Sequence, residues 1–218
     1  MTFCRRTESL TGNANQLLVA THNQGKKQEY LELLAPLRVD VRFPDEMSIH
    51  LEVRDDGDTY AENARKKARP HALASEMLTI ADDSGLEVDA LGGAPGIHSA
   101  RYASGTDADR VQALLSDLTG VPWDERTARF HCVIAMVTPE GSVHQAKGVC
   151  EGQIAYAPAG EGGFGYDPIF YVSEYGKTMA QLSRRTKNRI SHRARAVEAA
   201  LPTLKHLLEE QRADPPPG

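Results

Sequence analysis

The sequence predicts an α/β protein built on one mixed β-sheet, and two observations lead to that prediction. A short apolar run at residues 16–20 is followed by a polar, glycine-containing turn and then by apolar residues at helical spacing. Farther along, residues 128–138 and 142–151 are long strand-like segments joined by Pro139-Glu140-Gly141, which predicts a hairpin. Because strands linked by a helix run parallel and hairpin strands run antiparallel, one sheet that holds both kinds is mixed.

Length and composition favour a single globular domain. The chain has 218 residues, of which 40% are hydrophobic and 25% charged, and we expect a leader at 1–15 that is mobile, a domain at 16–210 and a disordered tail at 211–218. The net charge of -5 argues against a dedicated duplex-binding surface but not against a local site for a small anion. Three cysteines without CxxC spacing disfavour a zinc or disulfide framework. No apolar run approaches the roughly 18 residues of a membrane span, so we expect a soluble, cytoplasmic protein.

The first turn is the earliest candidate for a binding site. Residues 21–26 separate the apolar run from a helix in which Tyr30, Leu33, Leu34 and Leu37 recur. Such a strand–turn–helix unit aims backbone N–H groups and a helix N-terminus at an anion. The turn does not have a Walker A sequence, so an ordinary βα turn with surface lysines remains an alternative.

The next segment alternates strand, loop and helix. Residues 37–43 alternate between apolar and polar and predict a second strand that ends at Pro44. An acidic loop fills 45–58, and Thr59 with Glu62 forms a capping box for a helix to about residue 74. Pro70 should kink or shorten that helix.

The central stretch, residues 80–102, carries the strongest chemical signal. An apolar lead-in ends in Asp82 and Asp83, and Ser84-Gly85 predicts a turn directly after this strand. Carboxylates at the end of a buried strand cost free energy unless they are paired, hydrogen-bonded or bound to metal. Mg²⁺ fits because it takes oxygen ligands and often binds together with a phosphate. Side chains alternate along a strand, so one aspartate should face a cleft while the other holds the turn; an acidic turn without function is the alternative.

The remaining elements complete the α/β pattern. A capping box at 106–109 starts an amphipathic helix that ends near Gly120. Residues 153–156 extend the hairpin beyond a bulge expected at Gly152, and 169–172 form a short strand. Thr178 caps a helical turn. The last helix begins near residue 191, and Pro202 should bend it.

Three distant segments share one chemical theme. The turn at 21–26 offers amide donors and a cation, the region 55–83 offers carboxylates, and 187–193 offers cations at a helix start. Together these are what a Mg²⁺–polyphosphate requires. The glycine-rich segment 161–167 adds Phe164 and Tyr166, and a ring stacked on a nucleobase contributes about 1–3 kcal/mol. Packing of both rings in the sheet core is the alternative.

Long blocks of the chain resemble the inosine triphosphate pyrophosphatases, also called dITP/XTP pyrophosphatases. The similarity covers residues 16–208, and the blocks that carry it are LLVATHNQGK (17–26), TYAENARKKA (59–68), IADDSGLEVDALGGAPGIHSARY (80–102), GGFGYDPIF (162–170) and KNRISHR (187–193). The resemblance implies an elongated α/β fold with two lobes around a central substrate cleft. It also implies hydrolysis of ITP, dITP and XTP to the monophosphate and pyrophosphate, with Mg²⁺ as cofactor and a homodimer as the assembly.

The same resemblance assigns roles to individual residues. Asp83 is the general base and a metal ligand, and Ser84 beside it contacts substrate. The second metal carboxylate falls at about Asp55, with Glu62 as the competing candidate. Phosphates and base are bound by the other matched residues: Thr21, His22, Asn23, Gln24, Gly25, Lys26, Lys67, Phe164, Gly165, Tyr166, Asp167, Lys187, His192 and Arg193.

Base selection should depend on donors that face the 6-keto oxygen of the purine. His192 and Arg193 supply such donors, and adenine would leave them unpaired at a cost of about 1–3 kcal/mol. Guanine shares the keto oxygen, and the sequence does not show how its amino group is refused. Two alternatives are a pyrophosphatase for modified pyrimidine nucleotides and a nucleotide-binding regulator without activity.

Overall fold

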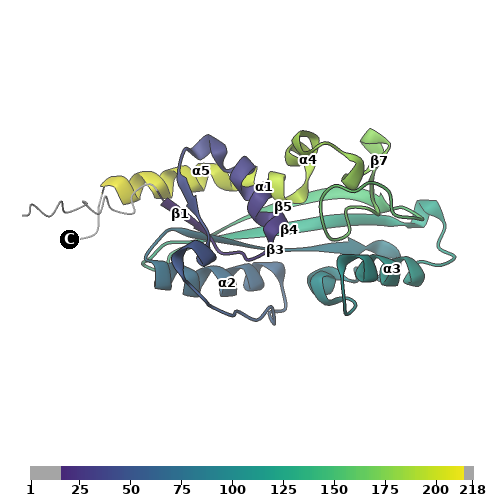
Figure 1. Ribbon diagram of the computed structural model, residues 1–218, viewed down its shortest axis with the longest axis horizontal. Coiled ribbons are helices and arrows are strands. Elements are labelled where there is room, and N and C mark those ends of the chain that lie inside the picture. The colour runs from purple at the N-terminus through teal and green to yellow at the C-terminus, as the bar shows by residue number, and fades with distance from the viewer. Residues whose placement is uncertain (1–15, 214–218) are drawn as a thin grey trace, which may run out of the picture.

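The computed structural model describes residues 16–213, in which one seven-stranded sheet runs the length of an elongated molecule (Figure 1). The strand order is β2-β1-β3-β4-β5-β6-β7. The strand bounds are β1 Gln16–Val19, β2 Asp40–Arg42, β3 Thr79–Val88, β4 Thr127–Val137, β5 Val143–Ile154, β6 Phe170–Val172 and β7 Lys177–Thr178. The expected leader and residues 214–218 of the expected tail lie outside the described part, whereas residues 211–213 continue the last helix.

The sheet is mixed, as predicted. β1 pairs in parallel with β2 and β3, and every later pair from β3 to β7 is antiparallel. Helices cover both faces: α2 and α3 lie on one side, and α1, α4 and α5 on the other (Figure 1). The helix bounds are α1 Gln24–Leu33, α2 Tyr60–Ser75, α3 Asp107–Asp117, α4 Arg184–Ile190 and α5 His192–Ala213. None of these helices has the length and apolar character needed to cross a membrane.

The two larger hydrophobic clusters of the described residues divide the molecule along the sheet. One gathers β1, α1 and α5 around residues such as Leu17 and Leu204, and the other gathers α3 and β6 around residues such as Leu114 and Phe170. Strands β3 and β4 pass through both clusters. A bilobed protein with a site where the lobes meet is therefore supported by the distribution of its core.

Three local expectations about the strands were wrong. Strand β3 does not turn at Ser84-Gly85, because its partner β4 is long enough to pair with it as far as Val88. No bulge occurs at Gly152, since the β4–β5 register is unbroken there. Residues 35–37 form a 3-10 turn, and Arg38 is left-handed (φ 53°), so the second strand is confined to Asp40–Arg42.

Neither internal proline ends its helix. Pro70 lies within α2 and Pro202 within α5, so the expected shortening of α2 does not occur. A proline removes one helical hydrogen bond, and tertiary packing stabilises both helices. The short helix α4, capped by the Ser183 side chain, was not predicted because it is only seven residues long.

Candidate active site

The candidate site lies beside the part of β3 that extends beyond the end of its neighbour β1. Strand β1 ends at Val19, paired with Ile80, while β3 continues to Val88. Beyond Val19 the chain leaves β1 and enters the turn of residues 21–23 that leads into α1. Asp82 and Asp83 therefore occupy a sheet edge that can be reached from both faces. A cavity of about 380 Å³ opens at this point.

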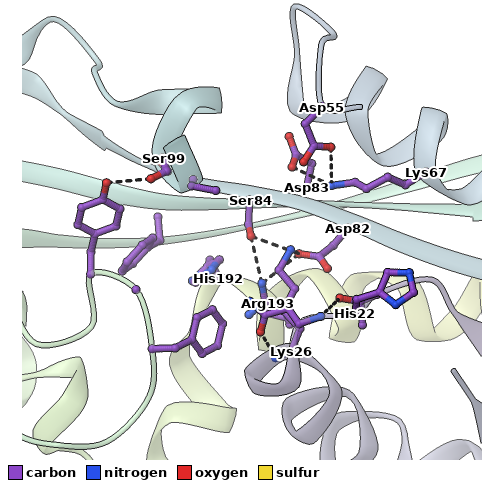
Figure 2. A pocket seen from close by; sticks show the side chains of 18 of the residues that line it. His22, Lys26, Asp55, Lys67, Asp82, Asp83, Ser84, Ser99, His192 and Arg193 are labelled. Atoms are coloured by element: carbon purple, nitrogen blue, oxygen red, sulfur yellow. Dashed lines mark hydrogen bonds and ion pairs between the residues drawn. The ribbon is translucent and has the colours of Figure 1, made fainter. Parts of the chain in front are cut away.

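Asp82 faces α1 and α5, and cationic side chains from both helices contact it (Figure 2). Its Oδ2 accepts hydrogen bonds from Lys26 Nζ at 2.9 Å, from Arg193 at 3.0 Å and from Ser84 Oγ at 3.2 Å. Burial alone would raise the pKa of Asp82, but the charges of Lys26 and Arg193 hold it well below its usual range. Asp82 is thus an ionised anchor for the cavity's cations, not the residue that holds a turn.

Asp83 faces α2 on the opposite side of the strand, which confirms the predicted alternation (Figure 2). Its Oδ1 accepts a hydrogen bond from Lys67 Nζ at 3.0 Å and its Oδ2 one from Asn63 at 3.1 Å. Burial raises the pKa of Asp83, although Lys67 and Asn63 oppose the change. A carboxylate with a raised pKa is suited to accept a proton near neutral pH.

Asp55 and Asp83 both contact Lys67. Asp55 Oδ1 is buried and lies 3.1 Å from Lys67 Nζ, yet no described residue is its partner in hydrogen-bonding geometry. The competing candidate, Glu62, is bonded elsewhere: it accepts from the Asp58 amide at 3.1 Å and pairs with Lys66 at 3.2 Å. The geometry therefore favours Asp55 over Glu62 as the second carboxylate.

A buried chain of ion pairs joins α1 to α4 and α5. Glu29 contacts Arg193 at 2.5 Å and Lys187 at 2.7 Å, and Lys187 contacts Asp167 at 2.5 Å. Through Arg193 and Asp82 the chain continues to Lys26. Sequence reasoning missed Glu29, although its position three residues after Lys26 places both on one face of α1.

The loop of residues 162–167 closes the other end of the cavity. The Phe164 ring lies 5.0 Å from Lys187 Nζ and 5.7 Å from the Arg193 guanidinium. A Cβ added at Gly25 would come within 2.4 Å of that ring, so the glycine admits Phe164. The Asp167 carboxylate accepts from the Phe164 amide at 2.9 Å, and Tyr166 donates its hydroxyl hydrogen to the Ser99 carbonyl at 2.9 Å.

His192 is a buried, neutral imidazole at this end. Burial, with the neighbouring Arg193 and Lys187 charges, holds the pKa of His192 well below its usual range. Its ring stacks on Phe130 with centroids 4.6 Å apart, and its Nδ1 is buried without a hydrogen-bond partner among residues 16–213. His192 also lines the cavity.

Most of the sequence-predicted residues line this one cavity. Gln24 and Gly25 do not line it and instead form the first turn of α1. His22 lines the cavity and also contacts Asp45 at 2.6 Å. The predicted residues that line it are Thr21, His22, Asn23, Lys26, Asp55, Lys67, Asp83, Ser84, Phe164, Gly165, Tyr166, Asp167, Lys187, His192 and Arg193.

Several further residues line the cavity that no sequence pattern marked. Asp82 was weighed only as the partner of Asp83, while His71, Asp107 and Arg110 lie on helices whose patterns indicate packing. No spacing signal marks them, because their approach to the cavity depends on how α2 and α3 pack on the sheet. Within residues 16–213, no cluster of three or more histidine, cysteine or carboxylate side chains is arranged to hold a metal ion.

Comparison with known proteins assigns the chain to a family. The Ham1 family model matches residues 17–203. A dITP/XTP pyrophosphatase of Desulforamulus reducens is 50% identical over 198 residues, which cover 90% of this chain and 98% of that protein. The dITP/XTP pyrophosphatase of Bacillus subtilis is 45% identical over 196 residues, 89% of this chain and 97% of that protein.

Solved structures agree with these sequence matches. The Staphylococcus aureus Ham1 protein superimposes with a TM-score of 0.75 at 41% identity and covers 90% of this chain and 99% of its own. A HAM1 protein from Coxiella burnetii gives a TM-score of 0.77 at 41% identity, over 89% of this chain and 98% of its own. The fold, the matched residues and the extent of the identity together establish that the chain belongs to the Ham1 family.

Proposed function

We propose that this chain is a dITP/XTP pyrophosphatase, which hydrolyses dITP, ITP and XTP to the nucleoside monophosphate and pyrophosphate. The observation that carries the proposal is the composition of a single cavity. Paired carboxylates and lysines line one end, and an aromatic loop with a neutral histidine and a buried arginine lines the other. A nucleotide with an ionised phosphate tail and a flat base needs both ends at once. The relatives named above as dITP/XTP pyrophosphatases support the same substrates.

Asp55 and Asp83 are the residues that would hold Mg²⁺. The two carboxylates converge on one point, and one of them has an oxygen without a hydrogen-bond partner among the described residues. This arrangement suits Mg²⁺, which binds one or two protein carboxylates and completes its coordination shell with substrate phosphate and water. When bound, Mg²⁺ would neutralise charge on the phosphates and lower the pKa of a bound water.

The chain's own residues supply the remaining chemistry. Asp83 accepts the proton of the water that attacks the α-phosphorus, and its raised pKa suits that task. Lys26 and Asn23, at the N-terminal end of α1, bind phosphate oxygens from one face of β3, and Lys67 binds them from the other. Thr21, His22 and Ser84 line the cavity between these cations.

The opposite end of the cavity recognises the base. Phe164 stacks on the purine, while His192 and Arg193 face its 6-keto oxygen. Arg193 is 1% exposed and held by Glu29 and Asp82, so it is positioned before substrate arrives. An adenine amino group offers these residues no acceptor, so Arg193 Nε, which is buried without a partner among residues 16–213, would stay unpaired at a cost of about 1–3 kcal/mol. ATP is therefore refused.

The test is a pyrophosphate-release assay with Mg²⁺ on dITP, ITP, XTP, GTP, ATP and dUTP in parallel. The proposal predicts rapid release from dITP, ITP and XTP and little from the other three. Preference for dUTP would support the pyrimidine pyrophosphatase alternative, and binding without release would support a regulator. A second arm omits Mg²⁺, and activity should then be lost.

The proposal extends to assembly and location. We place the enzyme in the cytoplasm as a homodimer, on the resemblance to its family and on the nucleotide pool that it would clear. Light scattering on the purified full chain measures the mass in solution. A mass near the 23.8 kDa of one chain would contradict the dimer without affecting the proposed chemistry.

A further inference from the structure

One cation at the base end of the cavity, Arg110, has no role in the mechanism above. It belongs to α3 and lines the same cavity as Phe164 and Tyr166. Its side chain is 18% exposed and contacts the Asp107 carboxylate, and one terminal nitrogen donates to the Gly105 carbonyl at 3.1 Å. A guanidinium has five N–H donors, so these two hydrogen bonds, the ones it makes among residues 16–213, leave donors for a ligand.

Arg110 is fixed to the loop that carries the stacking ring. Asp107 uses one carboxylate oxygen for Arg110 and the other for the Gly165 amide, at 2.7 Å. Arg110, Gly165 and Tyr166 line the same cavity. Arg110 is therefore held at the edge of the base slot.

The deep end of the slot has no surplus charge. Its two cations, Lys187 and Arg193, belong to a buried network that also includes Lys26 of the phosphate end, and three buried carboxylates match these three charges: Glu29, Asp82 and Asp167. That network can donate hydrogen bonds to a keto oxygen but offers little net attraction to a charged base. Arg110 lies outside it, and its partner Asp107 is half-exposed, so water screens that ion pair.

We propose that Arg110 is a specificity-determining residue that reads position 2 of the purine, favouring xanthine and refusing guanine. The inference rests on the proposed function and deepens it. Positions 2 and 6 of a purine flank a single ring nitrogen, so a base whose 6-keto oxygen faces Arg193 and His192 turns the neighbouring position 2 toward another wall of the slot. Arg110 lines the same cavity from α3, whereas His192 and Arg193 line it from α5.

The three keto purines differ at position 2 in ways that an arginine can read. Xanthine carries an oxygen there and loses a proton near neutral pH, so it offers Arg110 an acceptor and a negative charge. Hypoxanthine carries only hydrogen. Guanine carries an amino group, and because arginine has donors and no acceptor, the two sets of N–H groups oppose each other. Arg110 therefore accounts for the refusal of GTP, which the sequence does not explain.

Arg110→Met tests the inference, because methionine keeps much of the side chain's length but has neither charge nor donors. We expect kcat/KM for XTP to fall about tenfold or more, kcat/KM for ITP to change less than about threefold, and GTP hydrolysis to rise. Arg110→Lys should retain part of the preference for XTP. Arg69→Met removes the same charge from an exposed position on α2 and should leave all three values unchanged.

Measurements over a range of pH distinguish recognition of the base by Arg110 from a purely structural role of this residue. The wild-type ratio of XTP to ITP hydrolysis should rise as pH rises through the ionisation of xanthine, and Arg110→Met should flatten that rise. The inference would be overturned if Arg110→Met lowered kcat/KM equally for XTP and ITP, or if the ratio of XTP to ITP hydrolysis in this variant stayed at the wild-type value. If Arg110→Met folds poorly by circular dichroism, Arg110→Gln is measured in its place. A wild-type enzyme inactive on every keto purine would instead overturn the proposed function.

Discussion

At the scale of single residues, the two neighbouring aspartates of β3 show how position decides role. Asp82 and Asp83 differ by one place in the chain, yet they face opposite sides of the sheet and meet different cations. Asp82 is ionised and surrounded by Lys26 and Arg193, whereas burial raises the pKa of Asp83. The first therefore organises the cavity, and the second can take up a proton.

Replacement of Asp83 by asparagine should separate binding from turnover. Asparagine keeps the size and one acceptor oxygen but cannot take a proton, so kcat for ITP should fall by about 10²-fold or more. Binding of the product IMP, measured by calorimetry, should weaken far less. Asp89→Asn is a suitable control, since Asp89 pairs with Arg129 and is not among the cavity-lining residues. Near-normal turnover by Asp83→Asn would remove Asp83 from the mechanism.

At the scale of elements, the cavity depends on how closely α5 packs on the sheet. A Cβ added at Gly148 of β5 would come within 2.1 Å of the His192 carbonyl oxygen and 2.3 Å of the Ala196 amide nitrogen. The helix that carries His192 and Arg193 thus rests directly on a glycine. Any side chain there must push α5 away from the sheet.

Gly148→Ala should destabilise the protein and loosen base selection together. Forcing an extra methyl group into close packing costs about 1–3 kcal/mol, so the urea midpoint should drop. The ratio of ITP to ATP hydrolysis should drop as well, because His192 and Arg193 move with the helix. Lys147→Ala, the exposed neighbour on β5, should change neither. Wild-type stability in Gly148→Ala would show that α5 does not rest on this strand.

The sequence predicted elements where local patterns are strong and missed what depends on neighbouring strands. The Asn23 and Thr59 side chains cap α1 and α2, and the hairpin of β4 and β5 follows from alternation and a turn. The turn expected at Ser84-Gly85 was wrong because pairing with β4 outweighs the local preference of serine and glycine. Arg110 was missed because it reaches the cavity only through the packing of α3. Glu29 was missed although its spacing from Lys26 places both residues on one face of α1.

At the scale of the whole molecule, the structure buries two neutral histidines beside its binding cavity. Burial lowers the pKa of both His71 and His192, and the effect is larger for His192, which adjoins Arg193 and Lys187. The unfolded chain therefore binds more protons than the folded protein once pH falls below the ordinary histidine value of about 6.5. Stability contributed by these groups is present above that pH and is lost as pH falls through and below it.

Unfolding measured between pH 8 and pH 5 should show this loss. The free energy of unfolding should fall below about pH 6.5, with a slope of up to about 1.4 kcal/mol per pH unit for each histidine. His192→Gln removes one titrating group and should make the slope shallower. His206→Gln, at a side chain that is 70% exposed, should leave the slope unchanged. A pH-independent stability over this range would contradict the burial of a neutral His192.

The most direct test of the account is hydrolysis of XTP in ¹⁸O-labelled water with the products weighed by mass spectrometry. Attack of water on the α-phosphorus, with Asp83 as base, predicts one ¹⁸O atom in the monophosphate and none in the pyrophosphate. Label in pyrophosphate, or release of inorganic phosphate with a nucleoside diphosphate, would place the cleavage at another bond and contradict the account.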